Sequence, residues 1–269
     1  MSDDSVALRV WGDLALFTRP ELKVERVSYP MMTPSAARGV FDAILFRPQM
    51  LWHIRRIHVL EPQFPVDFPE SGRQLPFRLT PIRRNEIQDK ISTRNVQGWM
   101  KTPETVQPYL VDSAGREGAQ GEHRTQRNSL VLQYVSYLIE ATPRLTQRAN
   151  QPRIRPEDDE DHGPDTVAKY VAMFRRRAGK GQCFHRPYLG CREFACQFAL
   201  PDGTERTVDW TTNLGMMLYD IRFGTDGKHR PGFFDAQVNR GILHCDTLKA
   251  GLNGEAPVHV FGWDTGETT

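Results

Sequence analysis

The sequence lacks the marks of a membrane protein, a secreted protein or a zinc protein. It contains no long apolar run, and its first ten residues are acidic and have no apolar core of the kind that a signal peptide needs. We therefore expect a cytoplasmic protein without a membrane partner. The four cysteines include no C-x-x-C pair and match no common zinc spacing, which favours free thiols. Cys183 and His185 as a pair of metal ligands is the less favoured alternative.

The motifs of several enzyme classes are also missing. The sequence has no G-x-x-x-x-G-K-[ST], no G-x-S-x-G and no H-E-x-x-H, and no carboxylates cluster near its most basic stretch. A two-metal nuclease needs acidic oxygen ligands, so this class is disfavoured. We expect neither a metal nor a cofactor.

The most informative absence is that of acidic residues between Asp165 and Glu193. The basic side chains in this gap are Lys169, Arg175, Arg176, Arg177, Lys180, Arg186 and Arg192, with His185 beside them. The aromatic side chains among them are Tyr170, Phe174, Phe184 and Tyr188. Guanidinium forks match phosphate oxygens and aromatic rings stack on unpaired bases, so the segment suits a nucleic acid. The alternative is a solvated basic helix face above aromatics that pack in the core.

Overall charge gives a weaker indication than its distribution. The net charge is only +2, because the acidic run 157–161 offsets much of the basic segment that follows it. Local asymmetry of charge is the better guide to a polyanion site. With 39% hydrophobic and 25% charged residues in 269, the chain has an ordinary globular composition for one large or two small domains.

Hydrophobic patterns and turn residues predict the secondary structure. A helix should begin at Thr33-Pro34 and end before Pro48, and a second, capped by Asp165 or Thr166, should run to Gly179. The expected strands are 6–17 with a bulge at Gly12-Asp13, 50–60, 130–141, 193–200 followed by a hairpin turn at Pro201-Asp202-Gly203, and 214–223. Residues 94–122 show no clear pattern, and residues 146–166 read as an exposed insertion because they hold almost no large apolar side chains.

Several strings of the sequence occur together in one known family. They are WGDLALFTRPE, YPMMTPSAARGVFDAILFRP, IRRIHVLEP, PIRRNEI, HRTQRNSLVL and MFRRRAGKGQCFHRPYLGCREF, in this order along residues 6–200. This set resembles the type I-C CRISPR-associated Cas-five proteins, the d variant, in the repeat-associated RAMP superfamily. The resemblance implies an α+β fold, with a ferredoxin-like (RNA-recognition-motif-like) domain over 1–200 that carries the insertion near 146–166. A small antiparallel β domain would follow over 201–269.

The resemblance also implies a function. Its members look like metal-independent endoribonucleases that cut the repeat hairpin of a CRISPR precursor transcript. The product crRNA then stays bound, and the protein serves as a subunit of the type I-C interference complex, Cascade. The expected partners are therefore repeat RNA, crRNA and the other subunits, with duplex DNA as a further possibility. The alternative is a non-catalytic subunit that holds the end of the crRNA.

Cleavage without a metal uses the RNA's own 2′-OH, which attacks the adjacent phosphate and leaves a 2′,3′-cyclic phosphate and a 5′-OH. The resemblance implies a Tyr on the first helix and a Lys-His pair on the later one. Lys169 matches the Lys, whereas Tyr170 stands at the His position and Leu45 at the Tyr position. We expect Lys169 to stabilise the phosphorane charge and Tyr170 to orient or deprotonate the 2′-OH. His185 or His123 would replace the missing imidazole, because imidazole suits proton transfer near neutral pH.

RNA binding is expected to rest on arginines and one lysine. The candidates are Arg83, Arg84, Arg124, Arg127, Arg175, Arg176, Arg177, Lys180, Arg186 and Arg192. Successive residues of a helix point about 100° apart, so the three consecutive arginines cannot all face one way. We expect two of them to meet phosphates and one to be structural.

Overall fold

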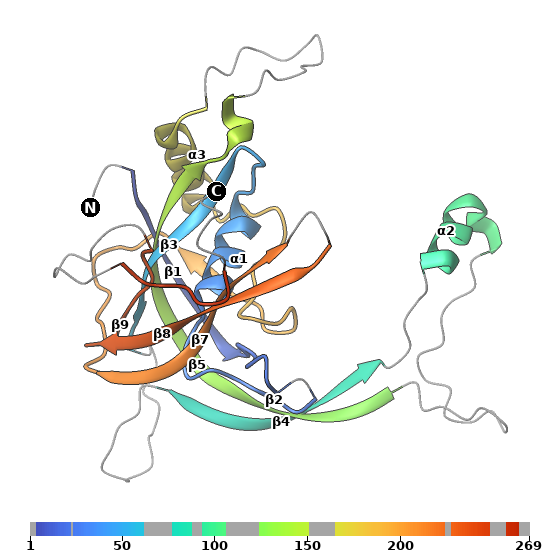
Figure 1. Ribbon diagram of the computed structural model, residues 1–269, viewed down its shortest axis with the longest axis horizontal. Coiled ribbons are helices and arrows are strands. Elements are labelled where there is room, and N and C mark those ends of the chain that lie inside the picture. Colours follow the sequence, from blue (N-terminus) through green and yellow to red (C-terminus); the bar gives the residue numbers. More distant parts are fainter. Residues whose placement is uncertain are drawn as a thin grey trace.

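One large sheet dominates the fold. The computed structural model describes residues 4–22, 24–61, 77–87, 93–105, 124–150, 165–223, 227–247 and 257–263, and their strands form a single nine-stranded sheet (Figure 1). The strands are β1 (Val6–Ala15), β2 (Arg26–Val27), β3 (Met50–Val59), β4 (Arg78–Ile87), β5 (Arg124–Leu145), β6 (Gln197–Ala199), β7 (Thr212–Phe223), β8 (His229–Asn239) and β9 (Ile242–His244). The helices are α1 (Pro34–Ile44), α2 (Thr93–Lys101) and α3 (Val167–Gly179), with 3-10 turns η1 (Pro103–Thr105) and η2 (Gln147–Asn150). The predicted mixture of helices with a mainly antiparallel sheet is confirmed.

The 22-residue strand β5 holds the sheet together. The strand order is β6-β1-β5-β3-β9-β8-β7, and β2 and β4 also pair with β5. The second half of β5 pairs with β1 and β3 inside the body, whereas its first half pairs with β4. Figure 1 shows this β4–β5 ribbon reaching away from the body, with α2 beyond its end and α3 at the opposite side of the molecule.

Both predicted helices begin at the predicted caps. The Thr33 hydroxyl accepts the backbone N–H of Ala36 at 3.3 Å, and Pro34 takes the first helical position. Thr166 likewise accepts the N–H of Lys169 at 3.2 Å. A threonine hydroxyl in this place satisfies a backbone donor that has no partner within the helix.

The two helices pack together over an aromatic cluster. The rings of Phe41 on α1 and Phe174 on α3 are stacked with centroids 4.7 Å apart, and Trp52 of β3 meets both rings edge-on. All three side chains are buried. Because aromatic pairs of this geometry add to the free energy gained by burial, the cluster fixes α1 and α3 against β3.

A bulge explains why the alternation of β3 predicts no consistent face. Trp52 and Ile54 are buried, and after a register shift between Ile54 and Arg56 the buried apolar residues become Ile57 and Val59, with Arg56 buried beside them. One extra residue in a strand reverses the parity of every side chain after it.

Two local predictions were wrong. The pairing of β1 with β5 runs without a register shift, so Gly12-Asp13 forms no bulge. Glycine is needed at position 12 because another segment packs closely against its backbone. A Cβ there would lie 2.7 Å from Leu189 Cδ1 and 3.0 Å from the Ala195 carbonyl oxygen. The turn at Pro201-Asp202-Gly203 does not fold β6 into a hairpin with the next strand, because β6 pairs with β1. Helix α2, most of which lies in the unpatterned stretch 94–122, was missed.

The strands after residue 200 continue the same sheet. β7 and β8 form a hairpin, β9 pairs with β8, and the other edge of β9 pairs with Arg56–His58 of β3. The division into 1–200 and 201–269 stays a prediction. Of the predicted insertion, 151–164 lies outside the described residues. No helix in the described ranges is long and apolar enough to cross a membrane.

Candidate nucleic-acid interface

The first turn of α3 is organised around a buried carboxylate. The Asp165 side chain is only 3% exposed, and its Oδ1 accepts the Tyr170 hydroxyl at 2.7 Å and lies 3.2 Å from Lys169 Nζ. Tyr170 is itself 2% exposed, so its ring belongs to the core. A buried carboxylate needs such partners, because an unpaired buried charge is strongly unfavourable. The structure thus brings Lys169 and Tyr170 together and holds both through Asp165.

The four aromatics of the basic segment divide into two groups. Tyr170 and Phe174 are buried with the rest of the apolar stripe of α3, which is the packing role given above as the alternative. Phe184 is 84% exposed, and Tyr188 is half-buried beside it in the loop after α3. Only the loop aromatics therefore present ring surface that a base could reach.

The three consecutive arginines also divide, but not as expected. Arg175 Nη2 donates to the Ser5 carbonyl at 3.0 Å, and Arg177 Nε donates to the Ile44 carbonyl at 2.7 Å at the end of α1. Within the described part of the chain, no hydrogen bond or ion pair holds the exposed Arg176 guanidinium. Two arginines thus bind backbone carbonyls, and Arg176 is the one that points into solvent without a partner there.

The loop after α3 carries the remaining predicted cations of this region. Lys180, Arg186 and Arg192 are exposed, as is His185. The N–H of Phe184 donates to the Ala43 carbonyl at 2.7 Å, which places the loop beside the end of α1. Lys169 lies in the first turn of α3 and the loop leaves its last turn, so the two predicted catalytic groups Lys169 and His185 occupy different ends of the helix.

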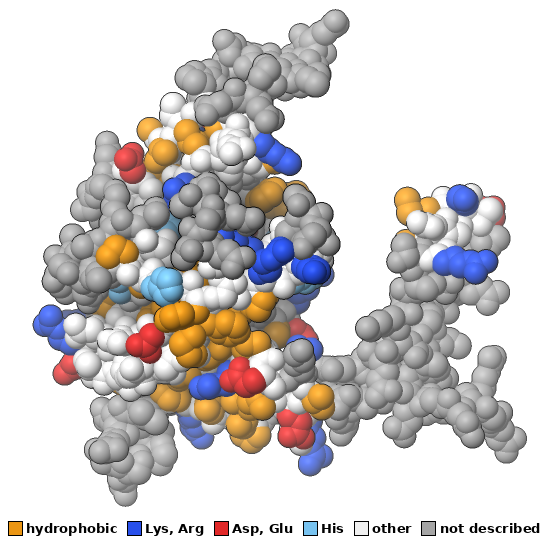
Figure 2. Space-filling model, in the orientation of Figure 1, with side chains coloured by type: hydrophobic (Ala, Val, Ile, Leu, Met, Phe, Trp, Pro, Cys, Tyr) orange, Lys and Arg blue, Asp and Glu red, His pale blue; other side chains and the backbone are white. Residues whose placement is uncertain are grey.

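The second set of predicted arginines lies on the β4–β5 ribbon. Arg83 is exposed, and the backbone register pairs Arg84 directly with Arg127 and Ile87 with Arg124. The side chains of Arg84, Arg124 and Arg127 are outside what the structure describes, as is His123 altogether. Figure 2 shows Lys and Arg at several separated places of the visible face, interspersed with other side chains, so the cations form no single field there.

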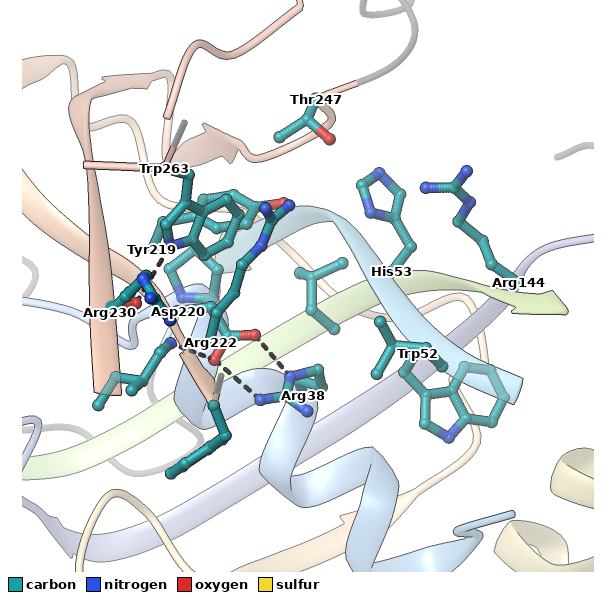
Figure 3. Close-up of a pocket in the computed structure, with 15 residues that line it drawn as sticks. Arg38, Trp52, His53, Arg144, Tyr219, Asp220, Arg222, Arg230, Thr247 and Trp263 are labelled. Carbon is teal, nitrogen blue, oxygen red and sulfur yellow. Dashed lines mark hydrogen bonds and ion pairs between the residues drawn. The ribbon is translucent and has the colours of Figure 1, made fainter. Parts of the chain in front are cut away.

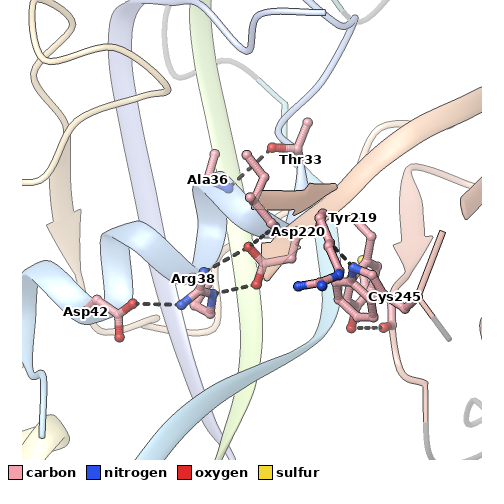
Figure 4. A network of polar contacts seen from close by, with 10 residues as sticks. Thr33, Ala36, Arg38, Asp42, Tyr219, Asp220 and Cys245 are labelled. Atoms are coloured by element: carbon pink, nitrogen blue, oxygen red, sulfur yellow. Dashed lines mark hydrogen bonds and ion pairs between the residues drawn. The ribbon is translucent and has the colours of Figure 1, made fainter. Parts of the chain in front are cut away.

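An ion-pair network joins α1 to β7 (Figure 4). Arg38 Nε lies 2.8 Å from Asp220 Oδ2, and Arg38 Nη1 lies 3.4 Å from Asp42 Oδ2. The pKa of Asp42 is raised to about 6, because burial, with a smaller contribution from Asp220, outweighs the lowering by Arg38 and His185. The carboxyl of Asp42 therefore titrates closer to neutral pH than an ordinary aspartate.

The position at which the resemblance implied a Tyr is apolar and closed. Leu45 is 3% exposed and ends α1, and its carbonyl accepts the indole N–H of Trp52 at 2.9 Å.

In the ranges that the structure describes, no three His, Cys, Asp or Glu side chains gather in a way that could hold a metal ion.

A cavity of about 430 Å³ lies between α1, β3 and the β7–β8 hairpin (Figure 3). Its basic side chains are Arg38, His53, Arg144, Arg222 and Arg230, and the one carboxylate among its described lining residues is Asp220. Sequence analysis did not find this group, because the arginines are distant in the chain and occupy no common motif.

Solved structures share the fold. A crystal structure described as that of a CRISPR-associated protein aligns with a TM-score of 0.54 at 19% identity, covering 91% of this chain and 92% of the other. The family model Cas_Cas5d, described as CRISPR-associated protein (Cas_Cas5), matches residues 5–242. The chain therefore belongs to the Cas5d family of CRISPR-associated proteins, as the sequence resemblance predicted.

Two curated relatives match nearly the whole chain. A protein of Mannheimia succiniciproducens is 38% identical over 245 residues, covering 88% of this chain and 93% of its own length. One of Thermus thermophilus is 36% identical over 259 residues, covering 90% of this chain and 91% of its own length. Both are named CRISPR pre-crRNA endoribonuclease Cas5d.

Proposed function

We propose that the protein is a pre-crRNA endoribonuclease that cuts the CRISPR repeat hairpin, keeps the product and serves as a subunit of an interference complex. The observation that carries this proposal is 38% identity, along 88% of this chain, to a protein named as such an enzyme. Exposed cations at the end of α3 and on the β4–β5 ribbon support it, because nucleic-acid affinity rests largely on phosphate contacts.

We also propose a ferredoxin-like core for this function. β1, α1, β3, β5, α3 and β6 follow one another as β-α-β-β-α-β, and their strands lie in the order β6-β1-β5-β3 with antiparallel pairs throughout. This element order is that of ferredoxin-like domains. Long insertions between the core elements, above all the β4–β5 ribbon, distinguish the chain from the minimal fold.

The proposed reaction needs no metal. The 2′-oxygen forms a bond to phosphorus, the bond from phosphorus to the 5′-oxygen breaks, and a proton passes from the 2′-OH to a base while another reaches the leaving oxygen. Lys169 would stabilise the extra negative charge of the phosphorane, since a cation placed where charge develops lowers the barrier. Because His185 lies beyond the opposite end of α3 from Lys169, we assign it to RNA binding rather than to proton transfer at the same phosphorus.

The contacts of Tyr170 change the role we propose for it. Its hydroxyl donates to Asp165 and its ring is buried, so this phenol is poorly placed to orient a 2′-OH directly. We assign it to fixing Asp165, which in turn holds the ammonium of Lys169. In this arrangement Tyr170 is a positioning residue and Lys169 the group that faces the phosphate.

A second candidate function is binding of the crRNA end without cleavage. Leu45 and Tyr170, which replace a Tyr and a His of the relatives' pattern, are both buried. If cleavage has been lost with these side chains, the protein would still hold RNA through its exposed cations.

Product chemistry tests the proposal. Purified protein is incubated with repeat RNA from the same CRISPR locus in EDTA, as wild type and as Lys169→Ala, His185→Ala and Arg240→Gln. We expect one cut with a 2′,3′-cyclic phosphate end in wild type, a loss of about 10²-fold or more in Lys169→Ala, and a smaller loss through weaker RNA binding in His185→Ala. Arg240→Gln, which changes an exposed arginine outside the proposed sites, should cut like wild type. Tight binding with no cut, in EDTA or in magnesium, would favour the second candidate.

A further inference from the structure

The cavity between α1, β3 and the β7–β8 hairpin has the size of a ligand site and is lined by several elements of the fold. Its volume of about 430 Å³ falls within the range of roughly 300–1,000 Å³ that is typical of small-molecule sites. Its walls come from elements that are far apart in the sequence, and Figure 3 shows His53 and Arg144 facing Arg222 and Trp263 across the hollow.

The wall chemistry selects an anion. The described lining contains four arginines and one carboxylate, Asp220, which already lies 2.8 Å from Arg38; its one histidine, His53, lies 3.1 Å from the carboxylate of Asp246 and adds no free charge. Guanidinium groups offer several planar donors in a fixed geometry that matches phosphate oxygens. A charged group with several oxygen acceptors therefore fits this cavity better than a neutral or cationic ligand.

One arginine is held in place by an aromatic ring. The Arg222 guanidinium carbon lies 3.9 Å from the centre of the Trp263 ring, and the Trp263 indole N–H donates to the Arg230 carbonyl at 3.2 Å. Trp263 is packed against Gly232, where a Cβ would lie 2.5 Å from the indole, and meets Tyr219 edge-on. The planar group of Arg222 is thus preorganised, which lowers the entropy lost on binding a ligand.

The rim supplies apolar surface as well as charge. Phe223 is 71% exposed and Leu51 is 44% exposed, and both line the cavity. An exposed aromatic ring beside several arginines is the combination that binds single-stranded nucleic acid, because the ring stacks on a base while the cations meet the backbone. A bare inorganic anion would leave this apolar rim unused.

We propose that this cavity binds one unpaired nucleotide of the repeat RNA next to the hairpin, with its phosphate toward Arg144, Arg222 and Arg230 and its base on Phe223. The proposal rests on the RNA-binding function proposed above and assigns it a second site, apart from the basic loop after α3. Retention of the product would then use single-stranded RNA as well as the hairpin.

Two RNA probes test the assignment by fluorescence anisotropy at one fixed salt concentration. One is the repeat hairpin with its single-stranded flanks, and the other is the same hairpin trimmed to blunt ends. The variants are Arg222→Gln and Phe223→Ala, with Arg240→Gln as the control. Arg240 is exposed at the opposite end of the same hairpin, and Phe223 is exposed enough that its truncation should leave folding intact, which thermal melts check.

We expect Arg222→Gln and Phe223→Ala to bind the flanked RNA about tenfold more weakly than wild type, and the blunt hairpin within about twofold of wild type. Arg240→Gln should match wild type on both probes. Equal affinity of all variants for the flanked RNA would overturn the site, as would an equal loss on both probes.

The same samples separate this proposal from the enzyme function. Cleavage by wild type together with unchanged flanked-RNA binding in the cavity variants would remove the cavity and leave the nuclease. Selective loss of flanked-RNA binding without cleavage in wild type would support the cavity and remove the nuclease. A wild type that binds neither RNA would overturn both.

Discussion

Asp42 shows, at the scale of a single residue, how burial sets the behaviour of a charge in this protein. Its carboxyl is 26% exposed, accepts one long contact from Arg38 and lies near Asp220, and its pKa rises from 3.8 to about 6. Between these two values the folded protein retains a proton that the unfolded chain has lost. The free energy of unfolding therefore falls as pH rises through this window, because the unfolded state binds fewer protons.

Asp42→Asn should remove this pH dependence. We expect the free energy of unfolding of the variant, minus that of wild type, to increase by about 1–3 kcal/mol from about pH 4 to about pH 7. Urea unfolding at several pH values measures the difference, and Asp13→Asn, which changes an exposed carboxylate of β1, is the matched control. A constant difference between Asp42→Asn and wild type across the range would contradict the assignment.

Gly190 shows how a single residue positions the loop that carries the exposed cations. Its φ is +85°, and a Cβ there would collide with the backbone carbonyl of Leu16 in the chain after β1. The neighbouring Leu189 carbonyl accepts the Leu16 N–H at 3.0 Å, so the loop runs in backbone contact with that segment. Only glycine combines this φ with so close an approach.

Gly190→Ala should cost about 2–4 kcal/mol of stability, through both the unfavourable φ and the collision. Gly203→Ala is a sharp control, since Gly203 has φ +88° but no atom within 4 Å of the added Cβ. That variant should lose only about 1–2 kcal/mol. Chemical denaturation measures the free energy of unfolding of both variants. Equal losses of stability would show that the close contact with Leu16 adds nothing to the cost of the substitution.

At the scale of elements, local signals allowed prediction wherever a cap or a periodic stripe was present. Thr33-Pro34 and Thr166 located the starts of α1 and α3, and the apolar stripe of α3 forms its buried face. That stripe includes Tyr170, so its spacing already indicated a packed residue rather than a free base. The prediction of a solvent-facing role rested on the resemblance, which carries no information about burial.

The elements that escaped prediction depend on contacts distant in sequence. The start of β5, with the sequence RTQRNS, has no alternating apolar pattern because it pairs with β4 outside the body. The bulge in β3 follows from its pairing with β5, and no turn residue in the sequence marks it. The cavity has the same origin, since its four arginines meet only when β7 and β8 come against α1 and β3.

At the scale of the whole molecule, the three-residue strand β9 connects the strands before residue 200 with those after it in one sheet. It joins the β7–β8 hairpin to β3, and the N–H of Cys245 donates to the Arg55 carbonyl at 2.9 Å just beyond it. Buried residues from both sides of this junction, among them Ile57, Phe234 and Leu243, belong to one continuous hydrophobic core. A boundary near residue 200 would therefore separate parts that share a sheet and a core.

This continuity predicts that the two parts unfold together. Urea unfolding followed by circular dichroism, and native-state hydrogen exchange of peptides from β1–β3 and from β7–β9, should report one shared transition and similar opening free energies. The physical reason is that detaching β7–β9 would expose the core side chains of β3 and break the β3–β9 pairing at once, so a partly unfolded state gains little entropy for a large loss of burial. Two separate transitions, with β7–β9 exchanging at a lower free energy than β1–β3, would instead show that the region after residue 200 is an independently folding domain and that β9 is only a weak link.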